Sequence, residues 1–120
     1  MHELAIAEGI ADVVATRAGE HHATRVTSVR LRIGDASGVV PDSLTFCFEM
    51  LASENPLLAG ARLAVETVPH RAHCRGCDRD FAVSDYIAQC PDCGVWSDQI
   101  ISGVELQVLD MEIETGEEAG

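Results

Sequence analysis

The segment HCRGCDRDFAVSDYIAQCPDCG, residues 73–94, contains two Cys-x-x-Cys pairs separated by twelve residues. Two such pairs place four thiolates around one tetrahedral centre, which is the arrangement that Zn²⁺ favours. The segment has little aliphatic bulk, so it needs a metal to hold it together, and bound zinc supplies on the order of 10 kcal/mol of folding energy. The pattern therefore predicts a zinc-ribbon-like module whose metal ligands are Cys74, Cys77, Cys90 and Cys93.

A closed shell of four thiolates has no open position for a substrate, which favours a structural role over a catalytic one. The same ligands would hold a rubredoxin-like iron, so the spacing leaves zinc and iron open. His70 and His73 precede the first pair. We interpret them as solvent-exposed loop residues, with replacement of a ligand or a hydrogen bond to the shell as the alternative. The apolar residues expected to pack around the metal are Phe81, Val83, Tyr86, Ile87 and Trp96.

The sequence before this module predicts two helices. Apolar residues recur at helical spacing over residues 4–18, and Gly19 is expected to end that helix. Pro41 suits the first turn of a second helix, and Cys47 is interpreted as a small residue of its buried side. The apolar stripe of this second helix consists of Leu44, Phe48 and Leu51.

Alternation of apolar and polar residues predicts strands over residues 24–33 and 62–67, and a last strand from Val104. The apolar phase of the last strand changes between residues 108 and 109, which indicates a β-bulge or a change of partner. Two helices on one face of a small three-stranded sheet form an α+β fold. The expected organisation is an α+β domain of residues 1–68 and 103–114, an inserted cysteine module of residues 69–102, and an acidic tail of residues 115–120.

The composition excludes several classes of function. The 120 residues carry 8 Lys plus Arg against 20 Asp plus Glu, a net charge of −12, whereas nucleic-acid binding needs clustered positive charge. No apolar run approaches the roughly 20 residues of a membrane span, and the N-terminus lacks a secretory signal. Paired carboxylates, a nucleophile motif and a phosphate loop are all missing from the sequence, so we do not expect an enzyme. We expect a soluble cytoplasmic protein whose cysteines bind metal rather than form disulfides.

The N-terminus offers a second set of metal ligands. Met1-His2-Glu3 brings a terminal amine, two amide nitrogens and an imidazole within reach of one ion, and Glu3 adds a carboxylate. A nitrogen-rich planar set suits Ni(II) or Cu(II). Because a histidine at position 2 is more often a frayed polar residue, this pattern does not decide the function by itself.

Four segments of the chain resemble the HypA/HybF family, the nickel-insertion accessory proteins of nickel–iron hydrogenase maturation: MHELAIAEGI, RVTSVRLRIG, PDSLTFCFEM and CPDCG. The resemblance covers residues 1 to about 114. It implies a nickel-binding α+β domain, to which the last strand returns, and a zinc-binding domain. It also maps the two metals onto this chain: Ni(II) as transient cargo onto Met1, His2 and Glu3, and structural Zn(II) onto Cys74, Cys77, Cys90 and Cys93.

The resemblance implies partners as well. Family members work with the GTPase HypB, pass nickel to the hydrogenase large-subunit precursor and in some bacteria serve urease, which adds urease accessory proteins. A weak homodimer is compatible with it, and we expect HypB on the exposed face of the first helix. Some members carry an acidic residue in the loop before the second helix, where this chain reads Gly38-Val39-Val40-Pro41-Asp42. Asp42 is interpreted as a first-turn residue of the helix rather than a nickel ligand.

The sequence therefore leaves three interpretations of the function. The first is a nickel metallochaperone that binds Ni(II) at His2 and releases it by ligand exchange, with zinc in a separate thiolate site. The second is a zinc-ribbon adaptor that binds a protein or a nucleic acid without nickel. A rubredoxin-like electron carrier is the third interpretation.

Overall fold

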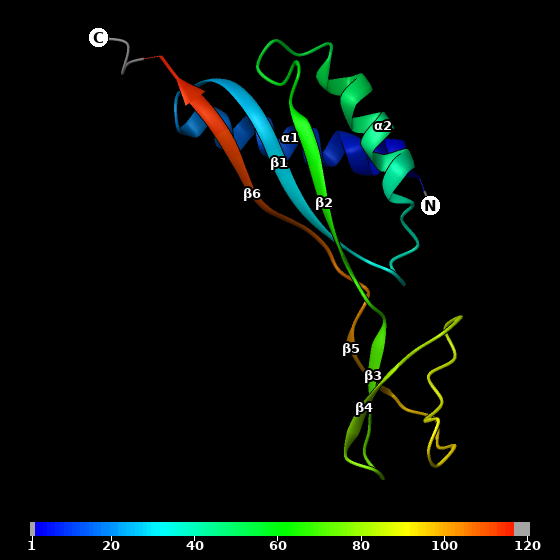
Figure 1. The fold of residues 1–120 in the computed structure, drawn as a ribbon. Coiled ribbons are helices and arrows are strands. Elements are labelled where there is room, and N and C mark those ends of the chain that lie inside the picture. Colours follow the sequence, from blue (N-terminus) through cyan, green and yellow to red (C-terminus); the bar gives the residue numbers. More distant parts are fainter. Residues whose placement is uncertain (1, 117–120) are drawn as a thin grey trace.

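The structure is a computed structural model that describes residues 2–116. It forms an elongated molecule of 64 × 28 × 16 Å with two three-stranded sheets placed end to end (Figure 1). This is the predicted α+β fold with an inserted second sheet. The elements are α1 (Glu3–Glu20), β1 (Ala23–Gly34), α2 (Pro41–Ala52), β2 (Arg62–Val68), β3 (Arg71–Cys74), β4 (Arg79–Ala82), β5 (Gln99–Ser102) and β6 (Leu106–Thr115).

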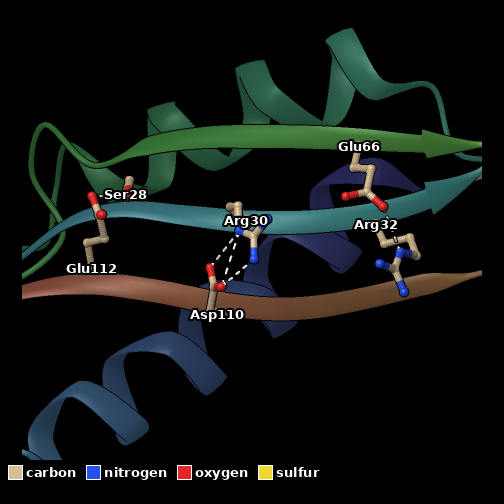
Figure 2. A network of polar contacts seen from close by, with 6 residues as sticks. All are labelled: Ser28, Arg30, Arg32, Glu66, Asp110 and Glu112. Carbon is tan, nitrogen blue, oxygen red and sulfur yellow. Dashed lines mark hydrogen bonds and ion pairs between the residues drawn. The ribbon is translucent and has the colours of Figure 1, made fainter.

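The first sheet has the strand order β2-β1-β6, with β1 parallel to β2 and antiparallel to β6. A parallel pair needs a crossover connection, and α2 supplies it. Figure 2 shows both helices behind this sheet, so they cover the same face. The core between the helices and the sheet is built from fully buried side chains, among them Val14, Val29, Leu31, Ile33, Leu44 and Phe48.

The predicted β-bulge in the last strand is confirmed. Arg30 pairs with Asp110, but the next residue, Leu31, pairs with Val108, so Leu109 is an extra residue in β6. Residues 108 and 111 are an odd number of positions apart and would face opposite sides of a regular strand. The bulge lets both Val108 and Met111 pack against the core.

The other face of the first sheet is polar (Figure 2). Arg30 Nη2 lies 2.6 Å from Asp110 Oδ2, and Arg32 Nε lies 3.0 Å from Glu66 Oε1. Ser28 Oγ donates to Glu112 Oε1 at 3.1 Å. Hydrogen bonds from Arg30 lower the pKa of the Asp110 carboxyl, and the same contact raises the pKa of Arg30. These cross-strand pairs explain the charged residues that alternate with the buried ones.

Most boundaries lie within one residue of the prediction, and three differences concern residues that the prediction named as ends of elements. Helix α1 passes through Gly19 and ends at Glu20, because the left-handed backbone conformation falls on His22, with φ 56°. Strand β6 begins at Leu106 rather than Val104, since Gly103, with φ 108°, turns the chain just before it. The strand continues to Thr115, so the predicted tail begins inside β6, and residues 117–120 lie outside the described residues.

Within residues 2–116, neither helix combines the length and apolar character needed to cross a membrane.

Candidate metal centres

The first Cys-x-x-Cys pair forms the turn between β3 and β4. Cys74 is the last residue of β3 and pairs with Arg79 of β4, so residues 75–78 form a tight connection. The Cys77 amide lies 3.5 Å from Cys74 Sγ and donates to it. Asp78 takes a left-handed conformation, with φ 52°. The strand pairing therefore fixes both sulfur atoms at one end of the hairpin.

The second pair lies in a similar turn. The Cys90 N–H donates to the Val95 carbonyl at 2.9 Å, and the Gly94 N–H donates to the Cys90 carbonyl at 2.9 Å. Gly94 has φ 77°, a conformation that a glycine adopts without steric cost. Gln89 closes the turn, because its side-chain Nε2 donates to the Gly94 carbonyl at 2.9 Å.

The two turns bring four sulfur atoms together. The distance is 3.5 Å between Cys74 Sγ and Cys93 Sγ and 3.9 Å between Cys77 Sγ and Cys90 Sγ. All four lie within 4.8 Å of one another. With metal–sulfur bonds of about 2.3 Å, the sulfur–sulfur edges of a tetrahedral zinc site are about 3.8 Å long. The geometry of the cluster therefore fits one tetrahedral metal ion.

The four neighbouring cysteines hold their protons with different strength. The amide of Cys93 is the main cause that lowers the pKa of Cys90, to about 7. The neighbouring Cys93 and Cys90 thiols raise the pKa of Cys77 to about 12. Four thiolates this close repel one another, and a cation removes that repulsion. A metal must therefore displace protons from the cluster, and acid weakens its binding.

The cysteine module has a small core of its own. Phe81 is buried and Val83 packs beside it, as predicted. The prediction that Tyr86, Ile87 and Trp96 pack around the metal is wrong, because all three are more than half exposed. Tyr86 lies in a turn with φ 64°, and its ring and that of His70 form a T-shaped pair whose centroids are 5.9 Å apart.

The sequence led us to expect that the two histidines before the first pair are solvent-exposed loop residues, and this prediction is wrong. His70 and His73 are half-buried, and His73 belongs to β3. His73 Nδ1 lies 2.7 Å from Asp80 Oδ1, and His73 Nε2 lies 3.3 Å from Asp78 Oδ1. Neither histidine belongs to the four-sulfur group. The carboxylates of Asp78 and Asp80 therefore orient the His73 ring beside the hairpin.

At the other end of the chain, His2 is exposed and precedes α1 as its N-cap residue. The Ile6 N–H donates to the His2 carbonyl at 3.2 Å, which is where the hydrogen-bond ladder of the helix begins. The His2 side chain makes no capping hydrogen bond. The amide nitrogens of residues 2 and 3 therefore have no place in the ladder. Met1, the third predicted nickel-binding residue, lies outside the described residues.

The Glu3 carboxylate lies at the start of α2. Its Oε2 accepts a hydrogen bond of 3.1 Å from the Val40 N–H, at the start of α2. This hydrogen bond is the largest of the effects that lower the pKa of the Glu3 carboxyl below its usual value. Asp42 is exposed in the first turn of α2, and Cys47 is half-buried against the core, as predicted for both. Sequence reasoning missed the bond between Glu3 and Val40. The position of Glu3 four residues before the buried Ala7 indicates that Glu3 lies on the inner stripe of α1, but it does not identify the residue that Glu3 contacts.

The fold and the site define a class: a small α+β protein with an inserted sheet that presents a four-cysteine metal site. The model of one family, described as "Hydrogenase/urease nickel incorporation, metallochaperone, hypA", matches residues 1–113. The chain belongs to this HypA family, which confirms the resemblance seen in the sequence. By its description the family is one of metallochaperones that serve nickel incorporation, rather than of enzymes.

Individual relatives agree. The hydrogenase maturation factor HypA of Geobacter metallireducens is 43% identical over 114 residues, which cover 95% of this chain and all of the relative. That of Streptomyces avermitilis is 44% identical over an alignment of 120 positions, which covers 97% of this chain and 89% of the relative. The solution structure of the Ni metallochaperone HypA from Helicobacter pylori has the same fold, with a TM-score of 0.68 at 20% identity over 97% of this chain and 100% of the other.

Proposed function

We propose that this chain binds one Ni(II) ion at its N-terminus and delivers it for hydrogenase maturation, with urease as a second client. The ligands are the His2 imidazole, the Met1 amine and the main-chain nitrogens of residues 2 and 3. Four nitrogens in a plane are a set that Ni(II) favours. Exposure of the site lets an incoming partner ligand attack the ion and remove it.

The observation that carries the proposal is the position of His2. It is exposed, it makes no capping bond, and it directly precedes a helix whose first amides are outside the hydrogen-bond ladder. Its imidazole and the adjacent nitrogens can therefore reach one ion without breaking the helix. The family to which the chain belongs supplies the identity of the metal.

The four cysteines hold a structural Zn(II) in this proposal. Their sulfur–sulfur distances of 3.5 and 3.9 Å match a closed tetrahedral shell. Thiolates and nitrogen donors differ in softness and geometry, which keeps zinc and nickel in separate sites. Residues 69–102 then form the zinc-binding domain, and residues 1–68 with 103–114 form the nickel-binding domain.

The same proposal includes the cytoplasmic location, a weak homodimer and the partners. These are HypB, which would bind the exposed face of α1, the hydrogenase large-subunit precursor and urease accessory proteins. The strongly acidic surface, with a net charge of −12, supports protein partners over nucleic acid.

Equilibrium dialysis of nickel against zinc-loaded protein with an untagged Met1 tests the site. Wild type is expected to bind one nickel per chain, and His2→Ala is expected to lose it with its zinc content unchanged. His21→Ala is the matched control, because His21 is also exposed but lies at the far end of α1. Unchanged nickel binding in His2→Ala would move the site elsewhere. A wild type that binds no nickel at micromolar concentration would favour the zinc-ribbon adaptor.

A further inference from the structure

The start of α2 lacks a cap from its own sequence. Its N-cap residue is Val40, whose side chain cannot accept a hydrogen bond, and the next residue, Pro41, has no N–H. The Val40 N–H is instead satisfied by Glu3 Oε2, 37 residues earlier in the chain, at 3.1 Å. Glu3 of α1 thus takes the place of the glutamate of a capping box, which accepts a hydrogen bond from the N–H of the N-cap residue.

The phase of α1 explains this contact. Glu3 lies four residues before Ala7, on the helix stripe that continues through Ile10 and Val14 to the core. A carboxylate on this stripe faces the neighbouring elements rather than the solvent, and Glu3 is accordingly half-buried. Its neighbour, His2, is exposed.

We propose that Glu3 is a positioning residue for nickel rather than a nickel ligand: its carboxylate fastens the first turn of α1 to the Val40 N–H and so fixes His2 and the adjacent main-chain nitrogens for the ion. This inference rests on the proposed nickel site at the N-terminus. The amine, two amides and the imidazole already complete a planar set of four nitrogens, so the carboxylate has no position to fill in it. A hydrogen bond to an ionised acceptor is about twice as strong as a neutral one, which suits a fastening role.

Three substitutions separate the two roles. Glu3→Gln keeps an oxygen that accepts from the Val40 N–H but removes the anionic ligand. Glu3→Ala removes both. Val40→Pro removes the donor while leaving the Glu3 carboxylate in place, and the φ of −90° at Val40 is within about 25° of the value that proline prefers. Glu8→Ala is the control, because it removes an exposed carboxylate from the second turn of the same helix.

Nickel affinity is measured by equilibrium dialysis on zinc-loaded, untagged protein, together with the visible absorption band of planar Ni(II). We expect Glu3→Gln, whose neutral oxygen keeps about half of the bond strength, to weaken binding about threefold, and Glu3→Ala and Val40→Pro to weaken it roughly tenfold. The planar band should persist in all three, since the ligands are unchanged. In nickel-free protein, the amide resonance of residue 40 should move in Glu3→Ala and stay near its place in Glu3→Gln.

Equal losses in Glu3→Gln and Glu3→Ala, with an altered nickel spectrum, would overturn the inference and make the carboxylate a ligand. Wild-type affinity in Glu3→Ala would overturn it as well. If circular dichroism shows that Val40→Pro does not fold, the Gln and Ala pair decides alone. Persistence of nickel in His2→Ala would instead refute the proposed nickel site, a result that the Glu3 variants do not produce.

Discussion

Gly34 and Gly103 cross at the junction of the two sheets so closely that a methyl group on Gly34 would overlap the carbonyl carbon and oxygen of Gly103. Two hydrogen bonds surround this crossing: the Ala36 N–H donates to the Gly103 carbonyl at 2.7 Å, and the Gly34 N–H donates to the Glu105 carbonyl at 2.8 Å. Gly103 in turn lies against the backbone of His70. The chain thus passes between the proposed nickel and zinc domains through a packed junction.

Gly103→Ala is expected to destabilise the protein by more than about 1 kcal/mol, because alanine disfavours a φ of 108° and its methyl group would meet His70. Urea unfolding followed by circular dichroism measures this. Gly9→Ala is the matched control: a methyl group there meets nothing within 4 Å, and alanine favours the helix by about 1 kcal/mol. Equal stability of the two variants would contradict the packed junction.

Two phenylalanines on α2 give a second test. Phe48→Ala is expected to cost about 3–5 kcal/mol, because the ring is fully buried between the helices and the sheet. Phe46→Ala should change the stability little, since its side chain is 68% exposed on the opposite side of the helix. Thermal melts of the two variants measure the difference. Similar melting temperatures would mean that α2 packs with a different face.

The third prediction concerns the four cysteines. Removal of metal by a chelator should unfold β3, β4 and β5, because the small core of this module depends on the metal. The helical signal in circular dichroism should remain, since α1 and α2 pack on the first sheet. Metal analysis should find one zinc per chain, lost in Cys90→Ser. Cys47→Ser is the control, because Cys47 packs against the core between the helices and the first sheet. The Cys47→Ser protein should therefore still bind one zinc per chain.

Unchanged amide resonances of β3, β4 and β5 after complete removal of the metal would contradict the structural role of the ion. Iron rather than zinc in the purified protein would revive the rubredoxin-like interpretation.

Much of this fold was predictable from periodicity. The stripe of Leu44 and Phe48 gave the buried side of α2, and the change of phase at residue 108 gave the bulge in β6. Both are local patterns, and each indicates directly which residues face the core. The grouping of the four cysteines was predictable for a similar reason, since two short Cys-x-x-Cys spacings are the pattern of a tetrahedral four-thiolate site.

Features that depend on contacts distant in sequence were not predictable in this way. Gly19 has the residue type of a helix end, but the left-handed conformation fell on His22, where the chain enters β1. The exposure of Trp96 could not be read from its hydrophobicity, because the module has only short strands to cover it. The bond from Val40 to Glu3 joins two helices, and no local pattern contains both residues.

The last prediction concerns Arg30 and Asp110 on the polar face. Their contact lowers the pKa of the Asp110 carboxyl below its ordinary value of about 3.9. The contact therefore stabilises the folded state above that pH, and this stabilisation is lost as the pH falls through the folded pKa. Asp110→Asn should therefore lower the urea midpoint at neutral pH, and its difference from wild type should shrink upon acidification to about pH 3. The effect should be smaller than that of Gly103→Ala, because both side chains are about half exposed. Asp12→Asn, on the exposed side of α1, is the control and should show no such pH-dependent difference. A constant difference between Asp110→Asn and wild type across this range would mean that the ion pair does not stabilise the sheet.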